Sequence, residues 1–152
     1  MKKMLSIFGF SMGTIMLILV SLFSTFCVKA DTWIEPRVYK DNLCYDGDTC
    51  YVTATVLPEA LQKMSVRILG IDTPEIKGEC AKEKALAQEG KEFANKLFKV
   101  AKLIEYRDLE WDKYGGRILS NVYLDGELYS KKIIDAGLAR PYFGDKKEPW
   151  CN

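Results

Sequence analysis

The sequence contains no histidine in 152 residues. This absence removes the side chain that most often exchanges protons near neutral pH and most often binds transition metals. Any chemistry must therefore use carboxylates, arginines and bound metal. The five cysteines also include no Cys-x-x-Cys pair, which makes a zinc site a poor interpretation.

A large excess of one charge sign is missing as well. The formal net charge is +1, and residues 1–30 hold three lysines and no acids, so the charge of the remainder is −2. A mildly acidic protein is not a general duplex-coating protein held by counterion release. If the protein handles nucleic acid, it should use a few local arginines and lysines and a cation bound among its acids.

Residues 1–30 form a separate segment. Lys2 and Lys3 precede an apolar run over residues 4–28, and Val-Lys-Ala follows at the positions that a signal peptidase reads before Asp31. We interpret the segment as an export signal and expect residues 31–152 to form one periplasmic or secreted domain. The run is nearly as long as the roughly 20 helical residues that cross a bilayer, so an uncleaved anchor, with the membrane as a partner, is the alternative.

Four cysteines follow this segment: Cys44, Cys50, Cys80 and Cys151. Disulfides suit an exported chain better than metal ligation does. Three pairings are possible, and the sequence alone does not choose among them. We favour Cys44 with Cys50, which lie symmetrically about Gly47 in a predicted hairpin, and Cys80 with Cys151 by elimination; free buried thiols are the alternative.

The hydrophobic pattern predicts a mainly β domain with packed helices, of the α+β class. Strands are expected over residues 38–45, 49–56, 64–71, 103–106 and 118–124. An amphipathic helix is expected over 80–100, and a shorter one over about 128–136, ending before Gly137. Five strands with a helix after the third and a second short helix predict a five-stranded OB-type barrel. That fold binds oligonucleotides, oligosaccharides or proteins, so it does not give a function.

Three polar clusters could carry chemistry, at residues 46–49, 67–75 and 112–117. Each alone has an ordinary explanation as a turn or loop, but together they contain the parts of a metal-assisted phosphodiesterase. Calcium binds about six to eight oxygen ligands. The carboxylates of Asp48 and Asp72, with the Thr73 carbonyl, would supply about three, leaving positions for water and a substrate phosphate oxygen.

The arginines and a glutamate meet the remaining needs of that reaction. Guanidinium groups such as those of Arg67 and Arg117 neutralise the charge that builds on phosphate oxygens. Glu75 is placed to orient or deprotonate a water molecule. The alternatives are a surface salt bridge for Arg67 and a solvated loop acid for Glu75. Arg67 and Asp72 are five residues apart and would face opposite sides of a straight strand, so a bend near Gly70 or the following proline must bring them together.

Taken in order, these clusters resemble the staphylococcal nuclease or thermonuclease-like family over residues 38–139. The matching motifs are Asp-Gly-Asp-Thr at 46–49, Arg-x-x-x-x-Asp-Thr-Pro-Glu at 67–75, Asp-Lys-Tyr-Gly-Gly-Arg at 112–117 and Gly-Leu-Ala at 137–139. The third motif has one glycine more than the best-known member, and we expect that member's last helix to be missing after residues 137–139. We expect a Cys80–Cys151 bridge to tie the tail down in its place.

The resemblance implies an OB-type enzyme that hydrolyses DNA and RNA with calcium and leaves 3′-phosphorylated products. The roles that it implies are metal ligands at Asp48, Asp72 and Thr73, a general base at Glu75, phosphate clamps at Arg67 and Arg117, and terminal-phosphate contacts at Lys113 and Tyr114. We therefore expect an exported, monomeric, calcium-dependent nuclease acting on DNA and/or RNA, preferably single-stranded. The alternatives are a non-catalytic OB module that binds nucleic acid or protein, and a disulfide-stapled interaction domain.

Overall fold

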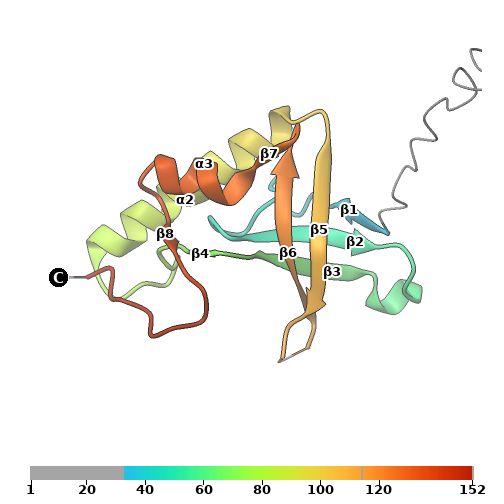
Figure 1. Cartoon of the computed structure of the whole chain (residues 1–152), viewed down its shortest axis with the longest axis horizontal. Coiled ribbons are helices and arrows are strands. Elements are labelled where there is room, and N and C mark those ends of the chain that lie inside the picture. The colour runs from blue at the N-terminus through green and yellow to red at the C-terminus, as the bar shows by residue number, and fades with distance from the viewer. Residues whose placement is uncertain (1–32, 114, 152) are drawn as a thin grey trace, which may run out of the picture. The chain divides into compact units, whose positions relative to one another are not determined.

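The computed structural model describes residues 33–113 and 115–151. The predicted export signal, Tyr114 and Asn152 lie outside the described residues. The described part is mainly β, with a curled sheet and two packed helices (Figure 1). In chain order its elements are β1 (Ile34–Pro36), β2 (Thr49–Ala54), the 3-10 helix η1 (Glu59–Leu61), β3 (Lys63–Ile68), β4 (Ile71–Asp72), α2 (Ala81–Val100), β5 (Ile104–Trp111), β6 (Arg117–Leu124), β7 (Glu127–Leu128), α3 (Tyr129–Asp135) and β8 (Arg140–Pro141).

The main sheet has the order β1-β2-β3-β6-β5, with β7 added to β6. All its pairs are antiparallel except β3 with β6, which is parallel. A parallel pair needs a long crossover, and here the chain passes through α2 and β5 between the two strands. In this topology α2 follows β3 and the two-residue β4. It is the OB-type arrangement with packed helices that the sequence predicts.

The core forms between the inner face of this sheet and the two helices. Burial alternates along β2, β3 and β6, so residues such as Val52, Val66 and Ile118 point inward. Phe98 of α2 meets Tyr129 of α3 edge to face, with ring centroids 5.3 Å apart. The buried Tyr129 hydroxyl donates a 2.7 Å hydrogen bond to the Gly47 carbonyl. The core is therefore attached directly to the Asp-Gly-Asp loop.

The prediction of a strand over residues 38–45 is wrong. The first strand is β1, earlier in the chain, and Lys40 and Asp41 adopt left-handed backbone conformations with φ of 48° and 65°. Tyr39 and Asn42 then hydrogen-bond to each other's backbone across this turn. Because the turn uses these groups locally, pairing with β2 resumes only at a bridge between residues 44 and 50.

Both favoured disulfides are formed in the structure. Cys44 is bonded to Cys50 across the bridge that follows the turn. Cys80, the N-cap residue of α2, is bonded to Cys151 near the end of the chain. The second bond fixes the tail beside the loop that follows β4. Among the described residues, no helix is long and apolar enough to cross a membrane.

Candidate metal and phosphate site

The loop at residues 46–49 directs Asp48 into the protein. The Oδ1 atom of Asp46 accepts hydrogen bonds from the backbone N–H groups of Asp48 (3.0 Å) and Thr49 (2.7 Å), which is the aspartate turn expected from this motif. A Cβ atom on Gly47 would lie 2.9 Å from Cγ2 of Thr73. Glycine is therefore required for the loop to close against the segment that carries Thr73.

The Asp48 carboxylate is completely buried and fully partnered. Its Oδ1 atom forms an ion pair with Arg67 and accepts a 3.1 Å hydrogen bond from the Thr49 hydroxyl. Its Oδ2 atom accepts hydrogen bonds from the Thr73 hydroxyl (2.7 Å) and backbone N–H (3.2 Å). A buried charge is tolerated only with such partners, so Asp48 joins three segments of the chain at one point.

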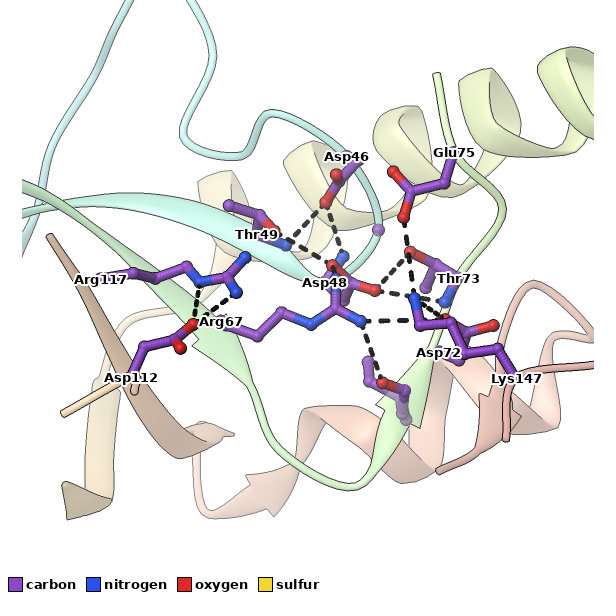
Figure 2. Close-up of polar contacts among 12 residues, drawn as sticks. Asp46, Asp48, Thr49, Arg67, Asp72, Thr73, Glu75, Asp112, Arg117 and Lys147 are labelled. Atoms are coloured by element: carbon purple, nitrogen blue, oxygen red, sulfur yellow. Dashed lines mark hydrogen bonds and ion pairs between the residues drawn. The ribbon is translucent and has the colours of Figure 1, made fainter. Parts of the chain in front are cut away.

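A bend at Gly70 brings Arg67 and Asp72 to one side. β3 ends at Ile68, Gly70 has φ +79°, and β4 begins at Ile71. The Arg67 Nη2 atom then lies 3.9 Å from Asp72 Oδ1 and 3.5 Å from the Ile71 carbonyl oxygen. The predicted bend is confirmed, and Figure 2 shows Arg67 extending between the two aspartates.

Asp72 is also buried, and its partners include residues that the sequence did not indicate. Its Oδ2 atom accepts a 3.1 Å hydrogen bond from the Trp150 indole N–H. Its Oδ1 atom lies 2.5 Å from Lys147 Nζ in an ion pair, but no donor is aligned to make a hydrogen bond with it. Lys147 and Trp150 belong to the irregular tail. The only signal in the sequence was the predicted disulfide at the neighbouring Cys151.

Glu75 lies at the mouth of this cluster. Its side chain is about half exposed, and Oε1 is 3.8 Å from Lys147 Nζ. Its backbone is fixed, because the N–H group donates to Oε1 of the buried Glu83 in α2 and the carbonyl accepts from Gly78 N–H. Glu75 faces a pocket of about 350 Å³ whose lining includes Asp72, Thr73, Lys147 and Trp150.

Arg117 stands on the same sheet face but has a different partner. It lies opposite Ser65 in the parallel β3–β6 pair, and Ser65 is two residues before Arg67. Residues opposite each other on paired strands, and alternate residues along one strand, point to the same face of a sheet. The Arg117 Nε atom donates a 2.7 Å hydrogen bond to Asp112 Oδ2. In Figure 2 this pair lies on one side of Arg67, and Glu75 and Lys147 lie on the other.

The extra glycine of the third motif is absorbed in the turn between β5 and β6. Gly115 and Gly116 both have positive φ, at 72° and 69°, which glycine adopts without strain. The turn closes through hydrogen bonds from Asp112 N–H to the Arg117 carbonyl and from Gly115 N–H to the Asp112 carbonyl. Lys113 is exposed in this turn, and the backbone at Arg117 stays in register with β3.

The carboxyl group of Asp46 is buried in this loop. Burial, and then the charge of Asp48, raises the pKa of Asp46 to about 7. Its backbone hydrogen bonds and Arg67 oppose this rise without cancelling it. Near neutral pH, Asp46 is therefore protonated to a larger extent than an ordinary aspartate.

The donor atoms of the cluster suit a hard divalent cation. Two buried carboxylates, from Asp48 and Asp72, face one arginine, and all the available ligand atoms are oxygens, which Ca²⁺ and Mg²⁺ prefer. The Oδ1 atom of Asp72 accepts no hydrogen bond but is paired with the ammonium of Lys147, so a cation that displaced Lys147 could bind it. Asp48, by contrast, already uses both oxygens, and a cation there must compete with Arg67.

Comparison with known proteins settles the family. Residues 65–150 match the family described as staphylococcal nuclease homologue. The chain belongs to the staphylococcal nuclease family. It is 30% identical over 108 residues to a thermonuclease of Staphylococcus hyicus, and 29% identical over 116 residues to a thermonuclease of Staphylococcus intermedius. These alignments cover 70% and 76% of this chain, but only 60% and 66% of the relatives.

Within this staphylococcal nuclease fold, the predicted site residues fall into three groups. Asp48, Arg67, Asp72 and Thr73 are brought into one contact network, with Glu75 at its edge through Lys147. Arg117 shares the sheet face but is held by Asp112. Lys113 lies in the exposed turn, and Tyr114 lies outside the described residues.

Proposed function

We propose that this protein is a nuclease that hydrolyses phosphodiester bonds of DNA and/or RNA, preferably single-stranded, with a bound calcium ion. The observation that carries the proposal is the pair of buried aspartates on either side of Arg67, beside an exposed glutamate. Burying a charge is costly unless an opposite charge and hydrogen bonds are held in place beside it. A module that only bound nucleic acid would need surface cations and aromatic side chains instead.

We assign the roles of the residues from the family resemblance and from the contacts described above. Asp48, Asp72 and the Thr73 carbonyl would hold the cation, which when bound would neutralise a phosphate oxygen and favour ionisation of nearby water. Glu75 at the pocket mouth would orient the attacking water and take its proton. Arg67 and Arg117 would bind the phosphate oxygens as negative charge grows on them. Water adds to phosphorus as the P–O5′ bond breaks, and the departing O5′ takes a proton from solvent, so the products would end in a 3′-phosphate and a 5′-hydroxyl. Lys113 and Tyr114, by the family resemblance, would contact a terminal phosphate.

We further propose that the protein is exported and acts as a monomer. Support for export comes from the N-terminal sequence pattern and from the pairing of all four cysteines in residues 33–113 and 115–151. Cleavage before Asp31 would release the protein into the periplasm or the medium. Retention of the segment would instead anchor the same domain to a membrane.

Digestion of single-stranded DNA and RNA by the purified protein tests the proposal. We expect cleavage in calcium and none in excess chelator. Glu75→Gln should lower kcat by about 10²- to 10⁴-fold, the usual range for loss of a general base. Glu89→Gln, at an exposed position of α2 outside this pocket, is the matched control and should cleave normally.

Several outcomes would contradict this scheme. Cleavage that continues in chelator would exclude the metal, and full activity of Glu75→Gln would remove the assigned base. Tight binding of single-stranded nucleic acid with no cleavage under any condition would favour the non-catalytic OB module.

A further inference from the structure

The tail that follows β8 folds back onto the proposed metal site. Trp150 Nε1 donates to Asp72 Oδ2 at 3.1 Å, and Lys147 Nζ lies 2.5 Å from Asp72 Oδ1. The same ammonium is 3.8 Å from Glu75 Oε1. Both oxygens of one proposed metal ligand, and the proposed base, are therefore in contact with the tail.

Several independent contacts fix the position of Trp150. β8 pairs with β4 so that Arg140 lies opposite Asp72. The Arg140 guanidinium lies 3.7 Å from the centre of the Trp150 ring and donates a 3.1 Å hydrogen bond to the Pro149 carbonyl. On the other side, Cys151 is bonded to Cys80. Trp150 is thus held between a strand pair and a disulfide, and its N–H group has a defined direction.

Lys147 is held much less firmly. Its side chain is 46% exposed, whereas that of Asp72 is 7% exposed. A lysine ammonium is a compact charge on a flexible stem, and this one reaches the buried Asp72 from solvent. Lys147 can therefore leave Asp72 when a divalent cation takes over its charge, while Trp150 stays.

We propose that the tail supplies two residues to the metal site. This inference rests on the proposed metal-dependent function. Trp150 is a positioning residue that fixes Oδ2 of Asp72 and leaves Oδ1 directed at the cation. Lys147 is an internal counter-cation that neutralises Asp72 and Glu75 until a divalent ion displaces it. Displacement frees its ammonium beside Glu75, where the substrate phosphate would enter.

The two residues should have opposite effects on calcium affinity. Lys147→Met removes a competing positive charge, so we expect calcium to bind about three- to tenfold more tightly. Trp150→Phe keeps a ring against Arg140 but removes the N–H donor, so we expect calcium to bind about three- to tenfold more weakly. A purely structural tail would give a loss of affinity, or no change, for both variants.

Calorimetric titration of the purified protein with CaCl₂ provides the test, with Lys146→Met and Trp111→Phe as matched controls. Both controls should bind calcium like the wild type. Chemical unfolding in chelator gives a second readout. There, Lys147→Met should be less stable than the wild type, because Asp72 loses a counter-ion, although its calcium affinity rises.

The outcomes separate this proposal from the proposed function. Suppose that the wild type binds calcium and Asp48→Ala abolishes that binding, while Lys147→Met and Trp150→Phe bind calcium like the wild type. That result would contradict the proposed role of the tail and leave the proposed metal site intact. Weaker binding by Lys147→Met would also overturn the role of Lys147. If the wild type binds no calcium at all, both proposals fail.

Discussion

The two arginines of the site are held in contrasting ways. Arg67 is 16% exposed and interacts with two buried aspartates from separate segments, whereas Arg117 is 37% exposed and pairs with one aspartate of its own hairpin. Arg67 is therefore part of the fold as well as of the proposed chemistry. Arg117 contributes mainly to the proposed chemistry and less to the fold, so variants at the two positions should differ in stability.

The largest effect is expected from Arg67→Ala. This change removes a phosphate-binding group and leaves Asp48 and Asp72 buried without their shared cation. We expect cleavage to fall by about 10³-fold or more, and the free energy of unfolding in chelator to fall by about 3 kcal/mol or more. Urea unfolding with and without calcium measures the second effect.

Calcium should restore part of this lost stability, because the ion would supply the missing positive charge. Arg107→Ala, at an exposed arginine of β5, is the matched control and should unfold like the wild type. Unchanged stability of Arg67→Ala in chelator would contradict its place in the fold.

A smaller effect, mainly on cleavage, is expected from Arg117→Ala. Loss of one group that stabilises the transition state typically costs about 10²- to 10³-fold in rate. Because Arg117 is 37% exposed and pairs with one buried aspartate rather than two, the free energy of unfolding should fall by less than in Arg67→Ala. Steady-state cleavage and urea unfolding of the same sample give both values. A loss of stability as large as that in Arg67→Ala would erase the contrast between the two arginines.

The smallest effect on cleavage is expected at Asp46, which shapes the loop at residues 46–49. Its pKa of about 7 in the folded protein exceeds the usual 3.8, so the folded state holds this proton over a pH range where the unfolded state has released it. The resulting stabilisation is full below about pH 4 and is lost as the pH rises to about 7. Urea unfolding across this range, in chelator, measures that slope.

Asp46→Asn should flatten this part of the pH profile. The amide oxygen of asparagine can still accept the hydrogen bonds from Asp48 and Thr49 N–H, so the loop keeps its shape without a titrating group. A wild-type slope that persists in Asp46→Asn would assign the pH dependence to other groups.

Much of the site could be predicted from the sequence because its motifs are local. The Asp-Gly-Asp loop, the bend near Gly70 and the helix ending before Gly137 depend on turn chemistry that a few residues specify. The strand expected over 38–45 is wrong because Asp41 and Asn42 favour a turn instead, and the three-residue β1 is too short to show an alternating pattern. The expected strand over 103–106 runs on through Trp111, since the register shift between Arg107 and Glu110 hides its alternation.

The contribution of the tail could not be predicted at all. Lys147 and Trp150 meet Asp72 only because β8 pairs with β4 and Cys151 reaches Cys80. These contacts join segments about 70 residues apart in the chain, and hydrophobic periodicity indicates only local secondary structure. The disulfide prediction located the tail, but not the direction of its side chains.

The most direct test of the central claim is the rate at which Asp72→Asn and the wild type cleave a single-stranded oligonucleotide, across a range of calcium concentrations. Asparagine keeps the size of the side chain and can still accept the Trp150 hydrogen bond, so only the charge at the proposed metal ligand is lost. We predict that the wild type cleaves only when calcium is present and that Asp72→Asn cleaves at least about 100-fold more slowly. Equal rates for the two proteins, or wild-type cleavage that is as fast in chelator as in calcium, would contradict a metal site at the buried aspartates.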